Sequence, residues 1–279
     1  MDNDNEKMEL RKATDYEKSE YNSIQKWENE PPNIVNQALG VVSTPAVWLA
    51  QKLVPQKAIE GCLNLANAAG SALADTRDIL RDGGVAKISD LKNGKLEVCD
   101  KIANSVHNWA LAFATAEGCA AGFFGLAGMA VDIPVLITFS LRSIHKVGLC
   151  YGYESISGDD ERFILNVLSA AGANNPTEKM AAITTMRSIQ QMIMKTTWKK
   201  MAETAAQKTF GKEAGVMAVK NLAKQLGINI TKRKALQAIP CIGAGIGATM
   251  NAQYINDICW AARRSFQKRW LDENCVEIK

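Results

Sequence analysis

The chain has 279 residues, of which 47% are hydrophobic and 22% charged, and its net charge is +4; this is the composition of a globular protein with a sizeable core. Only 6% of the residues are aromatic, and Ala, Leu, Met, Lys and Gln dominate its middle and end, which favours helix over sheet. Residues 1–30 carry nine acidic and five basic side chains, the reverse of a secretory signal, so we expect a cytoplasmic protein.

The cysteine and histidine content argues against a metal centre. Seven cysteines stand singly, without a CxxC pair, which is typical of reduced thiols that act as small hydrophobic residues. Polar neighbours predict that Cys99 and Cys275 are exposed. The two histidines, His107 and His145, lack zinc-binding spacing, and no nucleophile elbow, P-loop or dinucleotide fingerprint is present. We therefore expect no metal, no cofactor and no enzymatic activity.

Basic residues are concentrated in one segment, 178–234, which holds twelve Lys and Arg against three Glu. Such a segment indicates an anionic surface, and a solvated helix face explains it equally well. Nucleic acid is the less favoured partner, because aromatic interleaving and RG or RS runs are missing. The candidate residues for an anionic surface are Lys195, Lys199, Lys200, Lys208, Lys232, Arg233 and Lys234.

Along the chain, the pattern predicts a flexible polar N-terminus over residues 1–15, one helical domain over 16–270 and a tail over 271–279. One helix is expected before Pro31, and another is expected after Pro55. No alternating strand pattern is present. We therefore predict an all-α fold, a compact multi-helix bundle with little or no β-structure.

Three helices are predicted from apolar residues three or four positions apart. In the helix before Pro31 these residues are Tyr16, Ile24 and Trp27. In a long helix from Leu96 they are Val98, Ile102, Val106 and Trp109. In the basic segment they are Met180, Ile183, Met186, Ile189, Ile193 and Met194. Each set marks one apolar face of its helix, and the Met-rich stripe is expected to belong to the core.

Two apolar stretches, 117–152 and 235–266, are punctuated by glycine and predict two helical hairpins. The glycines and prolines that mark them are Gly118, Gly122, Gly125, Gly128, Pro134 and Gly152, and then Pro240, Gly243 and Gly247. Pairs of glycines four residues apart allow helix backbones to approach closely. The interpretations left open are a tight hairpin in a soluble core and a hairpin in the interfacial region of a bilayer, helped by the basic helices.

Within the first stretch, a helix is expected to begin near Pro134, with Asp132 as its cap, and to end at a left-handed Gly152. The same Asp132 argues against a membrane span, since an Asp at a helix centre costs roughly 2.5–3.5 kcal/mol on insertion. Neither glycine-rich stretch is therefore predicted to cross a bilayer alone.

One polar group accompanies the first stretch. Arg142 and His145 are three residues apart and hence neighbours on one helix face. If Glu117 or Asp132 folded back against them, Glu117, Asp132 and His145 would form a candidate acid–base site. A structural ion pair is the favoured interpretation, because buried polar groups must be paired in any case.

The glycine-rich stretches resemble the signatures of the EcsC family. The matching residues of the first are Ala-Glu-Gly at 116–118, Gly-Leu-Ala-Gly at 125–128, Asp-Ile-Pro at 132–134, Leu-Arg-Ser-Ile at 141–144 and Tyr-Gly-Tyr at 151–153. Those of the second are Ile-Pro at 239–240, Gly-Ala-Gly-Ile-Gly-Ala at 243–248, Asn251, Ala-Ala-Arg-Arg at 261–264 and Phe266. The resemblance extends over residues 16–270.

That family takes its name from a protein encoded beside the subunits of a bacterial ABC transporter. Its signatures are also similar to the helical tail of some membrane-associated bacterial GTPase-like proteins. The resemblance implies a non-enzymatic accessory protein of bacterial transport, secretion or stress and defence, peripheral at the inner face of the cell membrane. Its expected partner is an anionic membrane surface or a membrane protein. The alternatives are a peptidase-like hydrolase and a conditional membrane-permeabilising protein.

Overall fold

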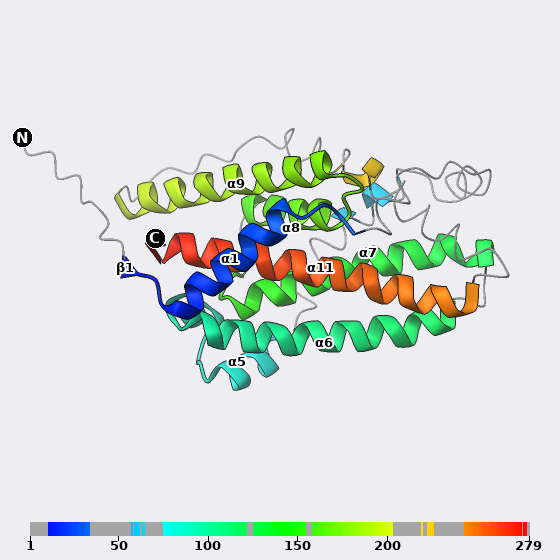
Figure 1. Cartoon of the computed structure of the whole chain (residues 1–279), viewed down its shortest axis with the longest axis horizontal. Helices are drawn as coiled ribbons and strands as arrows, with labels where there is room; N and C mark the ends of the chain where they lie inside the picture. Colours follow the sequence, from blue (N-terminus) through cyan, green and yellow to red (C-terminus); the bar gives the residue numbers. More distant parts are fainter. Residues whose placement is uncertain are drawn as a thin grey trace, which may run out of the picture.

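The computed structural model describes residues 11–33, 57, 59–61, 63–64, 75–121, 125–154, 158–202, 219, 222–225, 243–274 and 276–277, with the side chains of 117–134, 195–202 and 243–250 outside this description. Its helices are α1 (Asp15–Asn29), α5 (Arg77–Gly83), α6 (Leu96–Ala121), α7 (Gly125–Cys150), α8 (Gly158–Ala171), α9 (Pro176–Ala202) and α11 (Gly243–Glu273), with a 3-10 helix η1 (Ile88–Asn93) (Figure 1). Two short strands, β1 (Arg11–Lys12) and β2 (Val276–Glu277), pair in parallel. The all-α prediction is confirmed.

Helix α11 occupies the centre of the bundle. It packs against α6 and α7 on one side and against α8 and α1 on the other, while α9 packs on α8 (Figure 1). Its buried side chains include Tyr254, Ile258, Phe266 and Trp270. Because α1, α6, α7 and α8 all lie against it, α11 positions most of the side chains described below.

Helix α1 begins with a capping box. The Thr14 hydroxyl accepts a hydrogen bond from the Glu17 amide at 3.2 Å, and the Glu17 carboxylate accepts one from the Thr14 amide at 2.8 Å. Ile24 is fully buried, and Tyr16 and Trp27 pack against the core, as predicted.

The two ends of the described chain are tied together. Residues 11–12 and 276–277, predicted to belong to a flexible N-terminus and a tail, form β1 and β2, with Arg11 opposite Val276. Residues 271–273 belong to α11. Backbone pairing and the cap of α1 therefore order the part of both segments that the structure describes.

Helix α6 begins at Leu96 as predicted, but its buried stripe is Cys99, Ile102, Val106 and Ala110. Trp109 is 51% exposed, so the predicted apolar face is buried only in part. Cys99 is fully buried rather than exposed, and burial raises the pKa of its thiol to about 12. The spacing of three or four residues is correct, but it does not identify which of two adjacent stripes faces α11.

Helix α7 runs without interruption through Asp132 and Pro134, so the predicted helix start there is wrong. We attribute this to packing against α6 and α11, which outweighs the backbone hydrogen bond that Pro134 removes. The predicted end is confirmed, since Gly152 has φ 86°. The Tyr153 amide donates to the Gly148 carbonyl at 2.9 Å and the Gly152 amide to Leu149 at 3.0 Å, a Schellman motif.

In α9 the predicted stripe is largely confirmed, because Ile183, Met186 and Ile189 are buried. Met180 is 40% exposed, and the neighbouring Lys179 takes the inward position instead. The charged side chain is inward because it caps the end of α1, as described below.

The second predicted hairpin is not observed where the structure describes it, since residues 243–266 belong to the single helix α11 and residues 235–242, including Pro240, lie outside the described part. Consecutive α6 and α7 do pack together. None of the described helices has both the length and the apolar character needed to cross a membrane.

Candidate functional site

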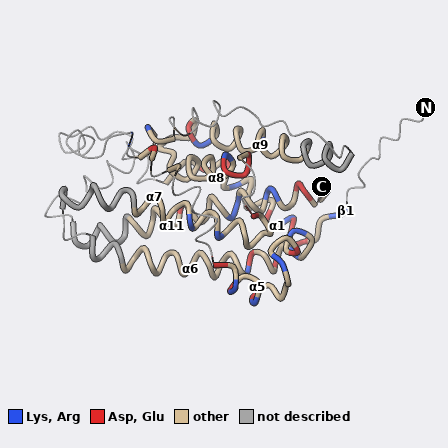
Figure 2. Tube along the Cα trace, turned by 180° about the vertical axis from the view of Figure 1, so that it is seen from behind, with Lys and Arg blue, Asp and Glu red and all other residues tan. Residues whose placement is uncertain are grey.

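The two ends of the bundle differ in charge. Figure 2 shows Lys, Arg, Asp and Glu on α1, α5, α8 and the end of α11 near the C-terminus. Residues 102–116 of α6, 135–141 of α7 and 251–256 of α11 include no charged side chain. Among the side chains that the structure describes, we refer to these three spans as the charge-poor end of the bundle and to the opposite one as the charged end.

An exposed aromatic surface lies on the charge-poor end. Trp109 is 51%, Val135 45% and Phe113 37% exposed. The ring of Phe113 stacks on those of Trp109 and Phe139, with centroid distances of 5.5 and 4.7 Å. The Arg142 guanidinium lies 5.9 Å from the Trp109 ring. These five residues, here called the aromatic patch, form a contiguous apolar surface from two neighbouring helices, a feature that marks interaction sites.

At the charged end, a buried carboxylate joins helices that are distant in sequence. Asp100 of α6 is 4% exposed and accepts hydrogen bonds from the Tyr16 hydroxyl at 2.8 Å, the Tyr151 hydroxyl at 2.5 Å and Gln267 Nε2 at 2.6 Å. Burial raises the pKa of Asp100, and its three donors partly oppose that shift. The arrangement fixes α1, α6, the end of α7 and α11 relative to one another.

Two arginines of α11 extend this polar packing. Arg264 donates to Glu20 of α1 at 2.6 Å. Arg269 is 4% exposed and bonds Asp160 of α8 at 3.0 Å and Glu273 at 2.8 Å. The carboxylates compensate the cost of burying these cations, so the pairs act as structural ties.

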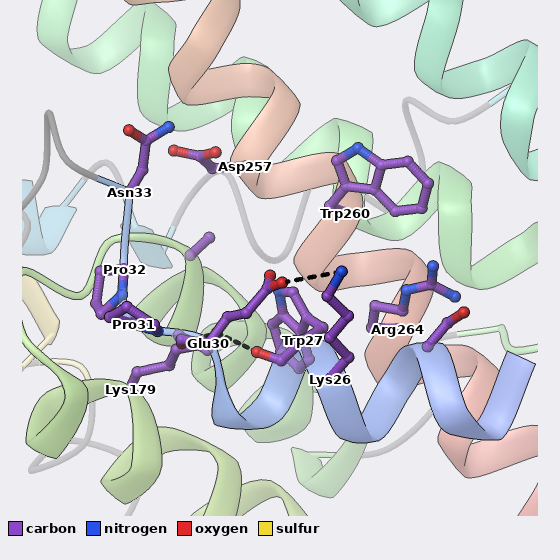
Figure 3. A pocket seen from close by; sticks show the side chains of 13 residues that line it. Lys26, Trp27, Glu30, Pro31, Pro32, Asn33, Lys179, Asp257, Trp260 and Arg264 are labelled. Atoms are coloured by element: carbon purple, nitrogen blue, oxygen red, sulfur yellow. Dashed lines mark hydrogen bonds and ion pairs between the residues drawn. The ribbon is translucent and has the colours of Figure 1, made fainter.

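A groove of about 490 Å³ lies where α1 ends (Figure 3). It is lined by the end of α1, residues 31–33, the end of α8, the start of α9 and one face of α11. Its aromatic side chains are Trp27 and Trp260, and its charged ones are Lys26, Glu30, Lys179, Asp257 and Arg264.

Lys179 shapes this groove by capping α1. Its ammonium donates to the carbonyl oxygens of Trp27 and of Glu30, the latter at 2.8 Å, and lies 4.7 Å from the centre of the Trp27 ring. Burial lowers the pKa of Lys179. The bond to Glu30 holds the chain where it turns away from the helix axis before Pro31.

Of the predicted acid–base group, the structure describes the side chain of His145 and the backbone positions of Glu117 and Asp132. Asp132 and His145 lie thirteen residues apart on the unbroken helix α7, which separates their backbones by about 20 Å. His145 is buried, and Arg142 lies over Trp109 instead. The side chains of Glu117 and Asp132 are outside the described part. Among the described residues, no cluster of three His, Cys, Asp or Glu side chains could hold a metal ion.

The remaining predicted residues are placed only by their backbones. Gly118 lies in α6, Gly125, Gly128 and Pro134 lie in α7, and Gly243 and Gly247 lie in α11. Gly122 and Cys275 are outside the described residues. Close approach of helices at these glycines stays a prediction.

Of the basic residues, Lys195, Lys199 and Lys200 belong to the last turns of α9, and Lys208, Lys232, Arg233 and Lys234 lie outside the described part. Helix α9 starts beside the end of α1 and runs towards the C-terminal end of α11, where Gln190 bonds Asp272 at 2.8 Å (Figure 1). The α9 part of the basic segment therefore points away from the aromatic patch.

Sequence reasoning missed both the groove and the aromatic patch. The available signals were Trp109 and Phe113, four residues apart in a charge-free span, and Asp257, Trp260 and Arg264 at positions i, i+3 and i+7 of one helix. Neither signal identifies a site until the facing helix is known.

Comparison with known proteins places the chain in a family. The model of the EcsC protein family matches residues 18–271. An uncharacterized protein of Bacillus subtilis (strain 168), YdbA, is 22% identical over 270 residues, which cover 92% of this chain and 93% of YdbA. No solved structure matches. Because the family match spans most of the sequence and includes both glycine-rich stretches, the chain belongs to the EcsC protein family.

Proposed function

We propose that this protein is a non-enzymatic accessory protein that associates peripherally with the inner face of a bacterial cell membrane and makes that contact through its aromatic patch. The observation that carries the proposal is the pair of exposed rings, Trp109 and Phe113, stacked on each other beside the partly buried Phe139, on a surface free of acidic side chains among the residues described there. Its biological context is a transport, secretion or stress-related assembly.

The chemistry of the patch suits the boundary between headgroups and acyl chains. Trp and Phe rings partition into that layer, and an adjacent Arg can reach lipid phosphates while its stem stays on the apolar surface. Each half-exposed ring that enters the boundary contributes on the order of 1 kcal/mol from apolar area removed from water. Such a contact is peripheral and reversible.

A membrane contact made through the charge-poor end has a low desolvation cost. With no charged side chain in residues 102–116 or 135–141, the neighbouring surface of α6 and α7 can approach the acyl boundary without stripping water from ions. The charged end carries many ion pairs, whose charged groups are more stable in water than at the membrane boundary. The bundle is thus polarised in the way that a one-sided membrane contact requires.

Flotation of the purified protein with liposomes tests the proposal. We expect the wild-type protein to float, and the double substitution Trp109→Ser with Phe113→Ser to reduce the partition coefficient roughly tenfold or more, from the area of two rings. Met180→Ser removes an apolar side chain of similar exposure from α9 and serves as the matched control. A double variant that floats like the wild type would overturn the assignment to the patch.

Lipid charge and salt separate the patch from the basic segment. Binding through aromatic rings should persist on zwitterionic vesicles and at high salt, whereas binding through Lys195, Lys199 and Lys200 should need anionic lipid and weaken with salt. Retention of an entrapped dye during binding is expected, because peripheral contact opens no pore; release of the dye would favour the permeabilising alternative.

A further inference from the structure

The groove at the end of α1 has an acidic and a basic side chain well separated along its α11 wall. On α11, Asp257, Trp260 and Arg264 follow one another at i, i+3 and i+7 and therefore share one face of the helix. The carboxylate and the guanidinium are rooted two turns apart, a rise of about 10 Å, with the indole between them. This wall of the groove thus presents an acid, an aromatic ring and a base in sequence.

The opposite wall carries an exposed ion pair of Lys26 and Glu30. Figure 3 shows Glu30 of α1 on the side of Asp257 and Asn33, and Lys26 on the side of Trp260 and Arg264. The Lys26 ammonium and Glu30 carboxylate are 3.7 Å apart, but their side chains are 77% and 53% exposed. A pair so solvated is worth little, so both groups can turn towards a bound molecule at small cost.

At the basic end, Arg264 keeps hydrogen-bond donors that could bind a ligand. Arg264 uses Nη1 for its bonds to Glu20 and to Gln267, and its Nη2 and Nε make no hydrogen bond to another part of the described chain. The Arg264 guanidinium also lies 5.0 Å from the centre of the Trp260 ring. Stacking and the Glu20 bond hold this cation in place, which limits the entropy lost on binding an anion.

The middle of the groove is apolar. Trp27 and Trp260 supply two indoles, and Pro31 and Pro32 close one side (Figure 3). On the α6 side, the His107 ring packs edge-on against Trp260 at 5.4 Å, which fixes the indole. His107 is buried whereas Trp109 is exposed on α6, so the groove and the aromatic patch use different faces of that helix.

We propose that this groove binds a small zwitterionic molecule, specifically a short peptide with free ends. Its amino group lies between Asp257 and Glu30, its carboxylate lies between Lys26 and Arg264, and its middle contacts the two indoles. An extended peptide spans roughly 3.3–3.6 Å per residue, so three residues match the rise of about 10 Å between the backbone positions of Asp257 and Arg264. The volume of about 490 Å³ is within the range of small-molecule sites.

A ligand with a single charge fits this groove less well. An organic anion would place its apolar body against the acids at the other end, and an organic cation would do the same against Lys26 and Arg264. Only a molecule with separated opposite charges satisfies both ends at once. This inference does not depend on membrane association and can succeed or fail independently of it.

Titration calorimetry with a defined tripeptide, Ala-Leu-Ala, tests the ligand class. We expect the free tripeptide to bind and its N-acetylated or C-amidated forms to bind about tenfold more weakly, since each loses one charge-assisted contact. The doubly blocked peptide should show no measurable heat. Absence of binding by the free peptide, or equal binding by the doubly blocked one, would overturn the proposal.

A charge-neutral variant tests the assigned orientation. Lys26→Gln should weaken binding of the free tripeptide about fivefold while leaving the C-amidated form unchanged, because the lost contact is to the carboxylate. Lys18→Gln, an exposed position on the same helix outside the groove lining, is the matched control and should bind like the wild type. Equal loss for both peptides, or a loss in the control, would contradict the placement; since both lysines are exposed, folding is not at risk.

Discussion

The charged end and the charge-poor end of this bundle are stabilised by different means. At the charged end, Asp100 and Arg269 are buried with hydrogen-bonded partners from several helices. At the charge-poor end, apolar packing is joined by hydrogen bonds of neutral side chains such as His107 with Asn256 at 3.0 Å, and Trp109 and Phe113 remain exposed. The difference separates side chains that stability requires from side chains that are available for binding. Buried polar groups must keep their partners, whereas exposed rings carry no such constraint.

The strongest test of the charged end is Asp100→Ala. It removes the acceptor for two tyrosine hydroxyls and one amide, and leaving these buried donors unpaired should cost about 3–5 kcal/mol of unfolding free energy. Urea unfolding measures the loss. Asp82→Ala, which removes an exposed carboxylate paired only with its neighbour Arg81, is the control and should change little. A loss below about 1 kcal/mol for Asp100→Ala would mean that the network is dispensable.

A smaller effect is expected at the junction of α7 and α11. In Gly148→Ala the new Cβ would lie 2.7 Å from the ring of Phe266, which also packs against the rings of Tyr151 and Phe163 and so has little room to move. We expect a loss of about 1–3 kcal/mol in thermal or urea unfolding. Gly158→Ala meets no atom within 4 Å and should be close to neutral. Similar losses for the two variants would show that the contact with Phe266 does not limit stability.

The pH dependence of folding stability tests how burial affects the ionisation of the Asp100 carboxyl. Its pKa is raised above the ordinary 3.8, so in the interval between these values the folded chain keeps a proton that the unfolded chain has released. Stability from this group is therefore complete below pH 3.8 and declines as pH rises through the interval. The stability of the wild type relative to Asp100→Asn should accordingly fall with rising pH. If that difference grew with pH, the carboxylate would be the form that its three donors favour.

The smallest effect on folding is expected for the aromatic patch. The double substitution Trp109→Ser with Phe113→Ser should change the unfolding free energy by no more than about 0.5–1 kcal/mol, because both rings are substantially exposed. Combined with the expected loss of liposome binding, this would assign the patch to interaction rather than to structure. A loss of several kcal/mol would show instead that the stacked rings are part of the core.

Several features could be predicted from sequence because they depend on local chemistry. The helical class follows from composition, and the end of α7 follows from Gly152, whose left-handed conformation favours that residue type. The start of α6 at Leu96 follows from periodic apolar residues. The EcsC assignment, first suggested by the two glycine-rich signatures, is confirmed by the family match.

The errors arise where tertiary contacts decide. Trp109 has the spacing of a core residue, but α11 packs on the adjacent stripe. Asp132 and Pro134 resemble a helix start, yet the helix passes through them. Lys179 is buried because it caps a helix that ends about 150 residues earlier in the chain. The groove likewise combines α1, α9 and α11, and no local pattern reports that the three meet.

The attachment of α1 has a consequence for the order of assembly. Its Glu20 carboxylate accepts hydrogen bonds from Arg264 and Gln267, which lie 244 and 247 positions later in the chain, and only three side chains of α1 are buried. During synthesis α1 therefore emerges long before its partners and cannot dock until they leave the ribosome. Helices α6 and α7 follow one another in the chain, so their contacts with each other are local and can form much earlier. Docking of α1, which is synthesised first, onto α11, which is synthesised last, is then expected to be a late step of folding.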